Sequence, residues 1–203
     1  QFSYRGLGMH YDGLTCALDG RHQLDNAACA LALVGAAAPQ GIAVTAEAVR
    51  AGLRAVNWAG RLEVLDYRPT ILLDGAHNPA AAMVLADYLT RSARSHPSRR
   101  VVLVLGMMRD KDHRGFVEPL RGLVDEVVLT QADLPRSATA QELRASLEGL
   151  LPHPHVVPSL SDAMALARQL AGPDDLVCVT GSLMLVGECK AWFRGCGLSP
   201  LRG

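Results

Sequence analysis

Asp74 and His77 are the residues whose types and spacing are best suited to chemistry, within the segment LDGAHNP at residues 73–79. Asn78 and Pro79 fit the N-cap and first position of a helix, so the segment sets a carboxylate and an imidazole beside free N–H groups. A carboxylate there can hold a ribose hydroxyl or a metal, and the imidazole can bind a substrate carboxylate. A plain helix cap and turn, with His77 a surface histidine, is the alternative interpretation.

Two further polar segments also follow apolar runs of strand length. Residues 106–112 (GMMRDKD) gather the charges of Asp110, Lys111 and Asp112, which suit a polar ligand or equally a solvated loop. Residues 180–182 (TGS) lead into a predicted helix and can form a small anion site at its N-terminus. Simple capping by Ser182 explains the same residues without a ligand.

Two upstream residues offer groups that suit a nucleotide. Arg61 follows Gly60 and carries a bidentate cation that suits a phosphate, although a surface salt bridge is the commoner fate of one arginine. Asn26 lies near the start of the first long predicted helix and offers both a donor and an acceptor. Those groups can read an adenine edge, or they can make a buried hydrogen bond between helices.

Alternating apolar and amphipathic segments from residue 59 onward predict the elements that position these groups. We expect strands at 62–67, 70–73, 101–105, 126–129, 155–157 and 176–179, and helices at 79–94, 114–123, 139–150, 161–171 and 183–194. Strands separated by helices indicate βαβ units, hence an α/β, Rossmann-like, mainly parallel sheet with helices on both faces. Ligands of such sheets bind at the carboxyl ends of the strands, where all three polar segments fall.

Residues 1–58 have a different character. The pattern predicts a hairpin or sheet edge in residues 1–19, a mostly buried Ala-rich helix at 22–38, and a helix at 46–56 capped by Thr45. Two helices and a hairpin make a poor core alone, and the chain begins at Gln1 within a strand-like pattern. We therefore expect 1–58 to be the tail of a preceding domain with a linker, 59–203 to be the next domain, and the chain to be an excised fragment.

The composition argues against several classes of protein. Lys+Arg 20 balance Asp+Glu 20, which gives no electrostatic footprint for nucleic acid or an anionic membrane. Apolar runs such as 101–105 are far short of a bilayer span, and no signal peptide is visible. Five cysteines without CxxC spacing indicate a reducing, cytoplasmic location and no metal site built from thiols.

The order of these segments resembles the folylpolyglutamate synthase/dihydrofolate synthase family of the Mur ligase superfamily. The resemblance rests on GxHQxxNA at 20–27, WxGRxE at 58–63, LDGAHNP at 73–79, DKD at 110–112 and TGS at 180–182. It spans nearly the whole chain. The pair GRxE and DGAHNP is specific to that family, since other Mur ligases carry looser versions of both.

The resemblance implies a reaction and a set of roles. Members of the family join L-glutamate to a folate or to dihydropteroate with ATP and Mg²⁺, through an acyl phosphate. Carried over by position, Asn26, Arg61 and Asp74 are expected to contact ATP, and His77 and Ser182 the glutamate, with Arg61 and His77 also catalytic. The resemblance also implies that residues 1–58 are the tail of the central ATP-binding domain with a linker, and residues 59–203 the Mur-ligase-type C-terminal, glutamate-binding domain. The P-loop and most magnesium ligands are expected in the ligase's own N-terminal domain, so that no metal site is expected here.

One departure from the family pattern limits what the chain is expected to do. No GxxxxGK[ST] motif occurs in the 203 residues, so we expect the chain to be inactive alone and its full-length parent to be the ligase. A Mur-type ligase for peptidoglycan or cyanophycin precursors is one alternative. A non-catalytic module that binds a nucleotide or amino acid is another. A dehydrogenase is disfavoured because no GxGxxG follows a strand.

Overall fold

The computed structural model describes residues 1–151 and 153–196, and the chain divides into two compact units. The first unit is Gln1–Arg61, and the second runs from Leu62 to the C-terminus. The expected division after residue 58, into the tail of one domain and the domain that follows it, stays a prediction.

The first unit contains a β-hairpin and two helices. Strands β1 (Phe2–Gly6) and β2 (Met9–Leu14) pair antiparallel, with Gly6 opposite Met9. The two turn residues, Leu7 and Gly8, have φ angles of 48° and 75°, as two-residue hairpin turns require. Helix α1 (His22–Ala37), the short 3₁₀ helix η1 (Ala38–Gln40) and helix α2 (Ala46–Ala55) follow. The Thr45 side chain caps α2 by accepting the N–H of Ala48 at 3.1 Å.

Helix α1 is far more exposed than its apolar composition predicts. The buried apolar side chains of the cluster shared by the hairpin and the helices are Leu14, Leu31 and Val49. Leu33, on another face of α1, is 72% exposed. The expectation of a mostly buried helix is therefore wrong for this unit, because its small core can cover only one stripe of α1.

The second unit is built on a six-stranded sheet with the order β3-β4-β8-β5-β6-β7. Its strands are β3 (Glu63–Tyr67), β4 (Thr70–Leu73), β5 (Val101–Leu105), β6 (Glu126–Leu129), β7 (His155–Val156) and β8 (Leu176–Thr180). All neighbouring pairs are parallel except β3 with β4. The predicted mainly parallel α/β class is confirmed.

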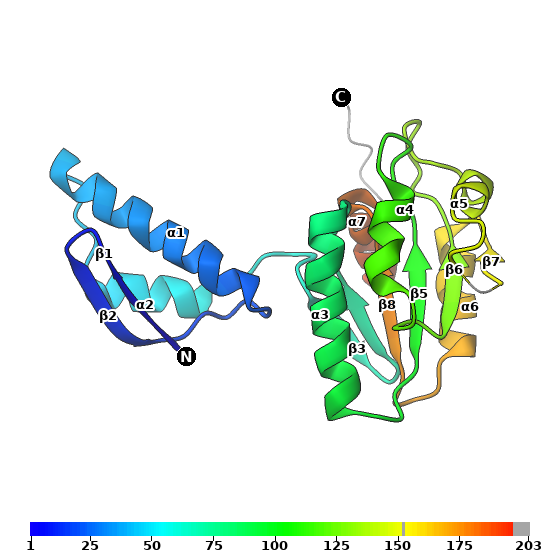
Figure 1. Ribbon diagram of the computed structural model, residues 1–203, viewed down its shortest axis with the longest axis horizontal. Helices are drawn as coiled ribbons and strands as arrows, with labels where there is room; N and C mark the ends of the chain where they lie inside the picture. Colours follow the sequence, from blue (N-terminus) through cyan, green and yellow to red (C-terminus); the bar gives the residue numbers. More distant parts are fainter. Residues whose placement is uncertain (152, 197–203) are drawn as a thin grey trace. The chain divides into compact units, whose positions relative to one another are not determined.

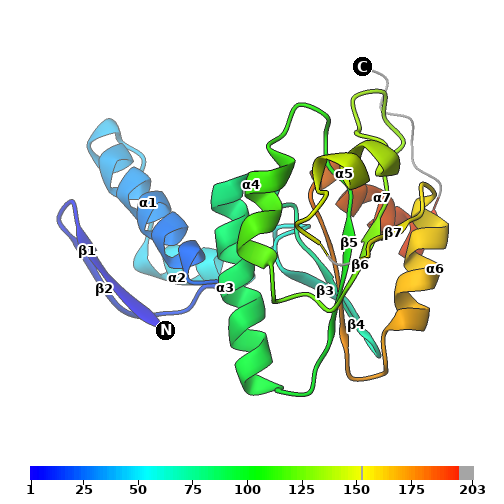
Figure 2. The same cartoon turned by 45° about the vertical axis from the view of Figure 1, so that its right-hand side comes forward.

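Helices cover both faces of this sheet (Figures 1 and 2). They are α3 (Pro79–Ser95), α4 (His113–Val117) with the 3₁₀ turn η2 (Glu118–Leu120), α5 (Ala140–Ser146), α6 (Leu160–Leu170) and α7 (Leu183–Phe193). Helices α3, α4 and α5 pack into one apolar cluster with strand residues such as Leu103, and α6 and α7 into a second cluster with residues such as Val104. Successive strand residues point to opposite faces, so one apolar strand serves both clusters.

Two predicted helices end earlier than expected. The helix expected at 114–123 stops at Val117 and continues as η2, because Pro119 has no N–H for the helical ladder. The helix expected at 139–150 ends at Ser146, and Gly149 beyond it has a φ of 77°. Local turn chemistry overrides the apolar period at both ends.

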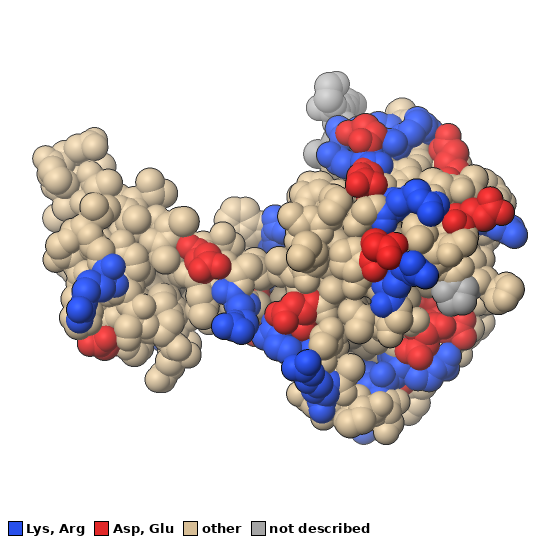
Figure 3. Space-filling model, viewed as in Figure 1, with Lys and Arg blue, Asp and Glu red and all other residues tan. Residues whose placement is uncertain are grey.

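The surface of the second unit carries both signs of charge. On the face drawn in Figure 3 its Lys and Arg side chains are intermixed with Asp and Glu. The expectation of no nucleic-acid partner stays a prediction. Across the part of the chain that the structure describes, no helix combines the length and apolar character needed to cross a membrane.

Candidate functional site

The three polar segments meet at the carboxyl ends of β4, β8 and β5, which are neighbours in the sheet. Main-chain hydrogen bonds join them. The Gly181 N–H donates to the Ala76 carbonyl at 3.0 Å, and the Gly106 N–H donates to the Thr180 carbonyl at 3.2 Å. The loops therefore form one connected edge, as the parallel-sheet rule predicts.

Gly181 allows the closest approach between these loops. Its φ is 100°, a conformation that side chains rarely adopt. A Cβ at this position would lie 2.7 Å from the Gly106 carbonyl oxygen and 2.7 Å from a methyl of Leu105. Glycine is required here for backbone geometry, and this geometry determines how the chain enters helix α7.

Asp74 is buried, with both carboxylate oxygens engaged by the main chain. Its Oδ1 accepts the Ala76 N–H at 2.9 Å, and its Oδ2 accepts the Leu62 N–H at 3.0 Å. Its negative charge also contributes to raising the pKa of the Cys178 thiol, after the larger effect of burial. Asp74 therefore has a structural function that the sequence did not indicate, beside the nucleotide contact predicted for it.

His77 projects from the same loop with a defined ring orientation. Its Nδ1 lies 2.9 Å from the Gly75 carbonyl oxygen. A carbonyl only accepts, so Nδ1 carries the proton of this hydrogen bond. The other ring nitrogen, Nε2, is then the atom that can meet a ligand. The next residue, Asn78, caps α3 by accepting the Ala81 N–H at 2.9 Å, as predicted.

Ser182 is the N-cap of α7 and is almost fully buried. Its Oγ accepts the Met184 N–H at 3.1 Å, which leaves the hydroxyl hydrogen available as a donor. Ser182 and His77 line one cavity of about 390 Å³ together with Gly181 and the start of α7. The structure thus brings the two residues predicted for glutamate to the same cavity, while their roles stay predictions.

Two cations complete the wall of this cavity, namely Lys111 and Arg136. Asp110 lies 3.7 Å from Lys111 and 3.6 Å from Arg136. Asp112, the other acid of the DKD segment, accepts the Gly115 N–H at 2.9 Å and caps α4. Of the charged residues at 110–112, Lys111 therefore faces the cavity, whereas Asp112 serves the backbone.

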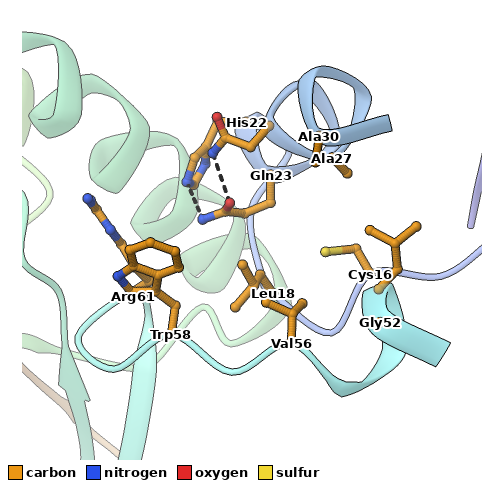
Figure 4. Close-up of a pocket in the computed structure, with 12 residues that line it drawn as sticks. Cys16, Leu18, His22, Gln23, Ala27, Ala30, Gly52, Val56, Trp58 and Arg61 are labelled. Carbon is orange, nitrogen blue, oxygen red and sulfur yellow. Dashed lines mark hydrogen bonds between the residues drawn. The ribbon is translucent and has the colours of Figure 1, made fainter. Parts of the chain in front are cut away.

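A second cavity, of about 560 Å³, lies within the first unit (Figure 4). It is lined mainly by apolar side chains, among them Leu18, Val56 and the exposed indole of Trp58. Asn26 and Arg61 are the polar and cationic residues of its wall that the sequence singled out. The prediction of a nucleotide contact for both residues is untested by this geometry.

Hydrogen bonds order the polar side of this cavity. The Asn26 amide donates to Gln23 Oε1 at 2.9 Å, and the Gln23 side chain in turn lies 2.9 Å from His22 Nε2. All three residues come from the first turns of α1. They give a cavity with mainly apolar lining a polar part, which is the mixture that small-molecule pockets commonly use.

Glu188 of α7 is a buried acid that the sequence did not single out. Its Oε1 accepts the Asp133 N–H at 2.9 Å, which ties α7 to the loop after β6. Burial raises the pKa of Glu188, opposed by that hydrogen bond, and the nearby Asp133 carboxylate raises it further.

No group of three or more His, Cys, Asp or Glu residues within 1–151 and 153–196 is arranged to hold a metal ion.

Arg136 is the cavity residue that sequence reasoning missed. Its loop follows β6, which is two strands away from β8 in the sheet. An isolated antiparallel bridge between Met108 and Ser137 brings this loop against the segment after β5. The sequence signal that could have found Arg136 is its place in the loop after a parallel strand, because polar residues in such loops are candidates for ligand binding.

The second unit is an α/β domain whose connected polar loops and cavity lie at the edge where mainly parallel sheets bind small polar ligands. The chain belongs to the Mur ligase family, because residues 60–183 match the family described as Mur ligase, glutamate ligase domain.

The relatives and solved structures agree with this assignment. The dihydrofolate synthase/folylpolyglutamate synthase of Mycobacterium tuberculosis is 35% identical over 208 residues, covering 93% of this chain and 42% of the relative. The structure of Mycobacterium tuberculosis folylpolyglutamate synthase complexed with ADP has a TM-score of 0.83 at 32% identity, covering 98% of this chain and 45% of that one. A bifunctional folylpolyglutamate synthase/dihydrofolate synthase with Mn, AMPPNP and L-glutamate bound has a TM-score of 0.78 at 31% identity, covering 92% and 43%.

The chain spans less than half the length of the relatives that it matches. More than half of the residues of those relatives therefore lie outside the region that this chain matches.

Proposed function

We propose that this chain is the amino-acid-binding part, with one side of the ATP site, of an ATP-dependent ligase. The ligase adds L-glutamate to a folate or to dihydropteroate through an acyl-phosphate intermediate. The observation that carries the proposal is the cavity shared by His77 and Ser182, in a domain of the glutamate ligase family. A cytoplasmic location for the ligase is supported by its free cysteines.

The cavity of the second unit suits the incoming amino acid. A carboxylate at the N-terminus of α7 would accept the Ser182 hydroxyl hydrogen and main-chain N–H groups, aided by the helix dipole. His77 offers Nε2 because Nδ1 is engaged by the Gly75 carbonyl. A neutral ring would accept a hydrogen bond from the substrate amine there, and a protonated ring would bind a carboxylate. The pH dependence of KM for glutamate separates these two modes.

The cavity of the first unit suits a purine base. Its apolar wall and its Asn26–Gln23 amides can contact the flat faces and the polar edge of an adenine. Trp58, 61% exposed, offers an aromatic surface for stacking. Arg61 on the same wall is the group we assign to phosphate, where its guanidinium would stabilise charge that develops on the acyl phosphate.

The described residues do not fit a Mg²⁺ site of their own, since no acidic or histidine cluster is arranged for one. We place the magnesium ligands and the P-loop in the ligase's own N-terminal domain. Phosphoryl transfer depends on positioned phosphates and metal ions, so the 203-residue chain is expected to be inactive alone.

The first experiment measures ADP release with ATP, Mg²⁺, L-glutamate and dihydropteroate. The full-length parent is expected to turn over, and the 203-residue chain is not. Turnover by the chain alone contradicts the division of the site between two parts. A parent that accepts UDP-linked acceptors instead of folates contradicts the assigned substrate.

The second experiment tests the individual roles in the parent enzyme. Arg61→Ala is expected to lower kcat sharply, because it removes charge stabilisation at the reacting phosphate. His77→Ala is expected to raise KM for glutamate most. An effect of His77→Ala confined to KM for ATP would show that His77 is assigned to the wrong substrate.

A further inference from the structure

We propose that Arg136 is a specificity-determining residue that binds the side-chain carboxylate of the incoming amino acid. The inference rests on the proposed function and deepens it, because it assigns the second carboxylate of the substrate to a named group. It starts from the charge of the cavity wall: two cations, Lys111 and Arg136, line the cavity beside His77 and Ser182, and no acid is among the lining residues.

The backbone of Arg136 is held firmly. The Arg109 N–H donates to the Arg136 carbonyl at 3.0 Å, and the Ala138 N–H donates to the Met107 carbonyl at 2.9 Å. These bonds flank the Met108–Ser137 bridge and fasten the loop after β6 to the loop after β5. The guanidinium therefore extends from a fixed point on the cavity wall.

The other end of the same loop is also fastened. The buried Glu188 of α7 accepts the Asp133 N–H, and α7 is the helix whose N-cap is Ser182. A single helix thus has Ser182 as its N-cap and holds the Arg136 loop from its middle. The two carboxylates of a bound amino acid would then contact Ser182 and Arg136, which are both held in place by helix α7.

The partner that Arg136 now has is weak. Its guanidinium lies 3.6 Å from Asp110, and both side chains are more than half exposed. Exposed ion pairs of this kind contribute little to stability, so a substrate carboxylate can replace Asp110 at small cost. A guanidinium can bind such a carboxylate through two parallel N–H donors, which the single ammonium of Lys111 cannot do.

The chemistry of the substrate class follows from these groups. An amino acid with an α-carboxylate and a second carboxylate can place the first at the N-terminus of α7 and the second on Arg136. A side-chain amide of the same shape leaves the guanidinium without a charged partner. Arg136 therefore distinguishes L-glutamate from its neutral isostere L-glutamine.

The test uses the full-length ligase with the substitution Arg136→Gln. KM for L-glutamate is expected to rise roughly tenfold or more, the loss of one charge-assisted contact, while KM for ATP stays within twofold. The inhibition or turnover constant for L-glutamine is expected to stay unchanged. A variant in which KM for L-glutamate stays within twofold, or in which the constants for both amino acids shift equally, overturns the proposal.

Two further variants separate charge from structure. Arg136→Lys keeps the charge without the bidentate geometry and is expected to lie between the wild type and Arg136→Gln. Arg121→Gln removes a surface arginine paired with Glu118 and is the matched control, with no expected change in KM. A wild-type parent that does not use L-glutamate refutes the proposed function and this inference with it. An active parent with an unaffected Arg136→Gln refutes the inference alone.

Discussion

Replacement of Asp74 by alanine in this chain is expected to lower the free energy of unfolding of the second unit by about 2–4 kcal/mol. The carboxylate accepts the N–H groups of Leu62 and Ala76, and both hydrogen bonds are buried. Each N–H left without a partner costs about 1–3 kcal/mol. The sum is reduced because the variant no longer pays for burying a charged group.

The assay is thermal unfolding of the 203-residue chain, followed by far-UV circular dichroism. For a unit of this size 1 kcal/mol corresponds to about 4 °C in Tm, so a fall of about 8–16 °C is expected. Asp74→Asn keeps one accepting oxygen and is expected to lose less. Asp87→Ala is the surface control, because Asp87 is exposed and pairs across one helical turn with Arg91.

A Tm for Asp74→Ala within 2 °C of the wild type would refute this reasoning. That result would show that the two N–H groups find other partners, and that Asp74 is available for a ligand alone. The expected result instead means that a loss of ligase activity in Asp74→Ala combines a structural defect with any lost nucleotide contact. Arg61→Ala has no such complication, because its side chain makes no hydrogen bond or ion pair with any of the described residues.

Three other outcomes follow from the structure. Gly181→Ala is expected to destabilise the second unit by more than about 1 kcal/mol in urea unfolding, because its φ of 100° and a main-chain oxygen 2.7 Å away exclude a methyl group. Burial raises the pKa of Glu188 in the folded protein above its pKa in the unfolded chain. The free energy of unfolding of the wild type should therefore fall as pH rises from the unfolded pKa to the folded pKa. Glu188→Gln should remove that fall, which urea unfolding at pH 4.5 and at pH 7 measures. Burial raises the pKa of Cys178, and that of Cys189 to about 12, so native alkylation at pH 8 read by mass spectrometry should modify exposed Cys29 and spare both.

The architecture of the second unit could be predicted because each strand is a short apolar run and each helix has an amphipathic period. Val101–Leu105, buried along its whole length, is typical of a central parallel strand. The errors occur where one residue overrides the period. Pro119 changes the end of α4, and Gly149 lies past the shortened α5. The exposure of Leu33 could not be predicted, because period and composition do not tell how large a core the neighbouring elements supply.

For the candidate site, too, some residues could be predicted from the sequence and others could not. His77 and Ser182 follow β4 and β8 directly, so sheet topology alone predicts that they lie at one edge. Arg136 belongs to a loop after β6 and reaches the cavity only because its loop pairs with the segment after β5. No periodicity encodes that pairing, which depends on hydrogen bonds between two irregular segments. The hydrogen bond from the Leu62 N–H to Asp74 is hidden for a related reason, since its donor and its acceptor lie in separate motifs.

Leu62 and Glu63, which end the GRxE motif, are tied by their contacts to the DGAHNP motif and to helix α7. Leu62, inside the first motif, has a φ of 49°, a left-handed conformation that costs a non-glycine residue about 1–2 kcal/mol. Its buried side chain and the hydrogen bond from its N–H to Asp74 offset that cost. Glu63, the next residue, pairs with Lys190 of α7, the helix that begins after Ser182. The segment that follows Arg61 is therefore fixed from two sides by the elements that carry His77 and Ser182, so a substitution at Asp74 or Lys190 should disturb that segment and the cavity lined by these two residues together.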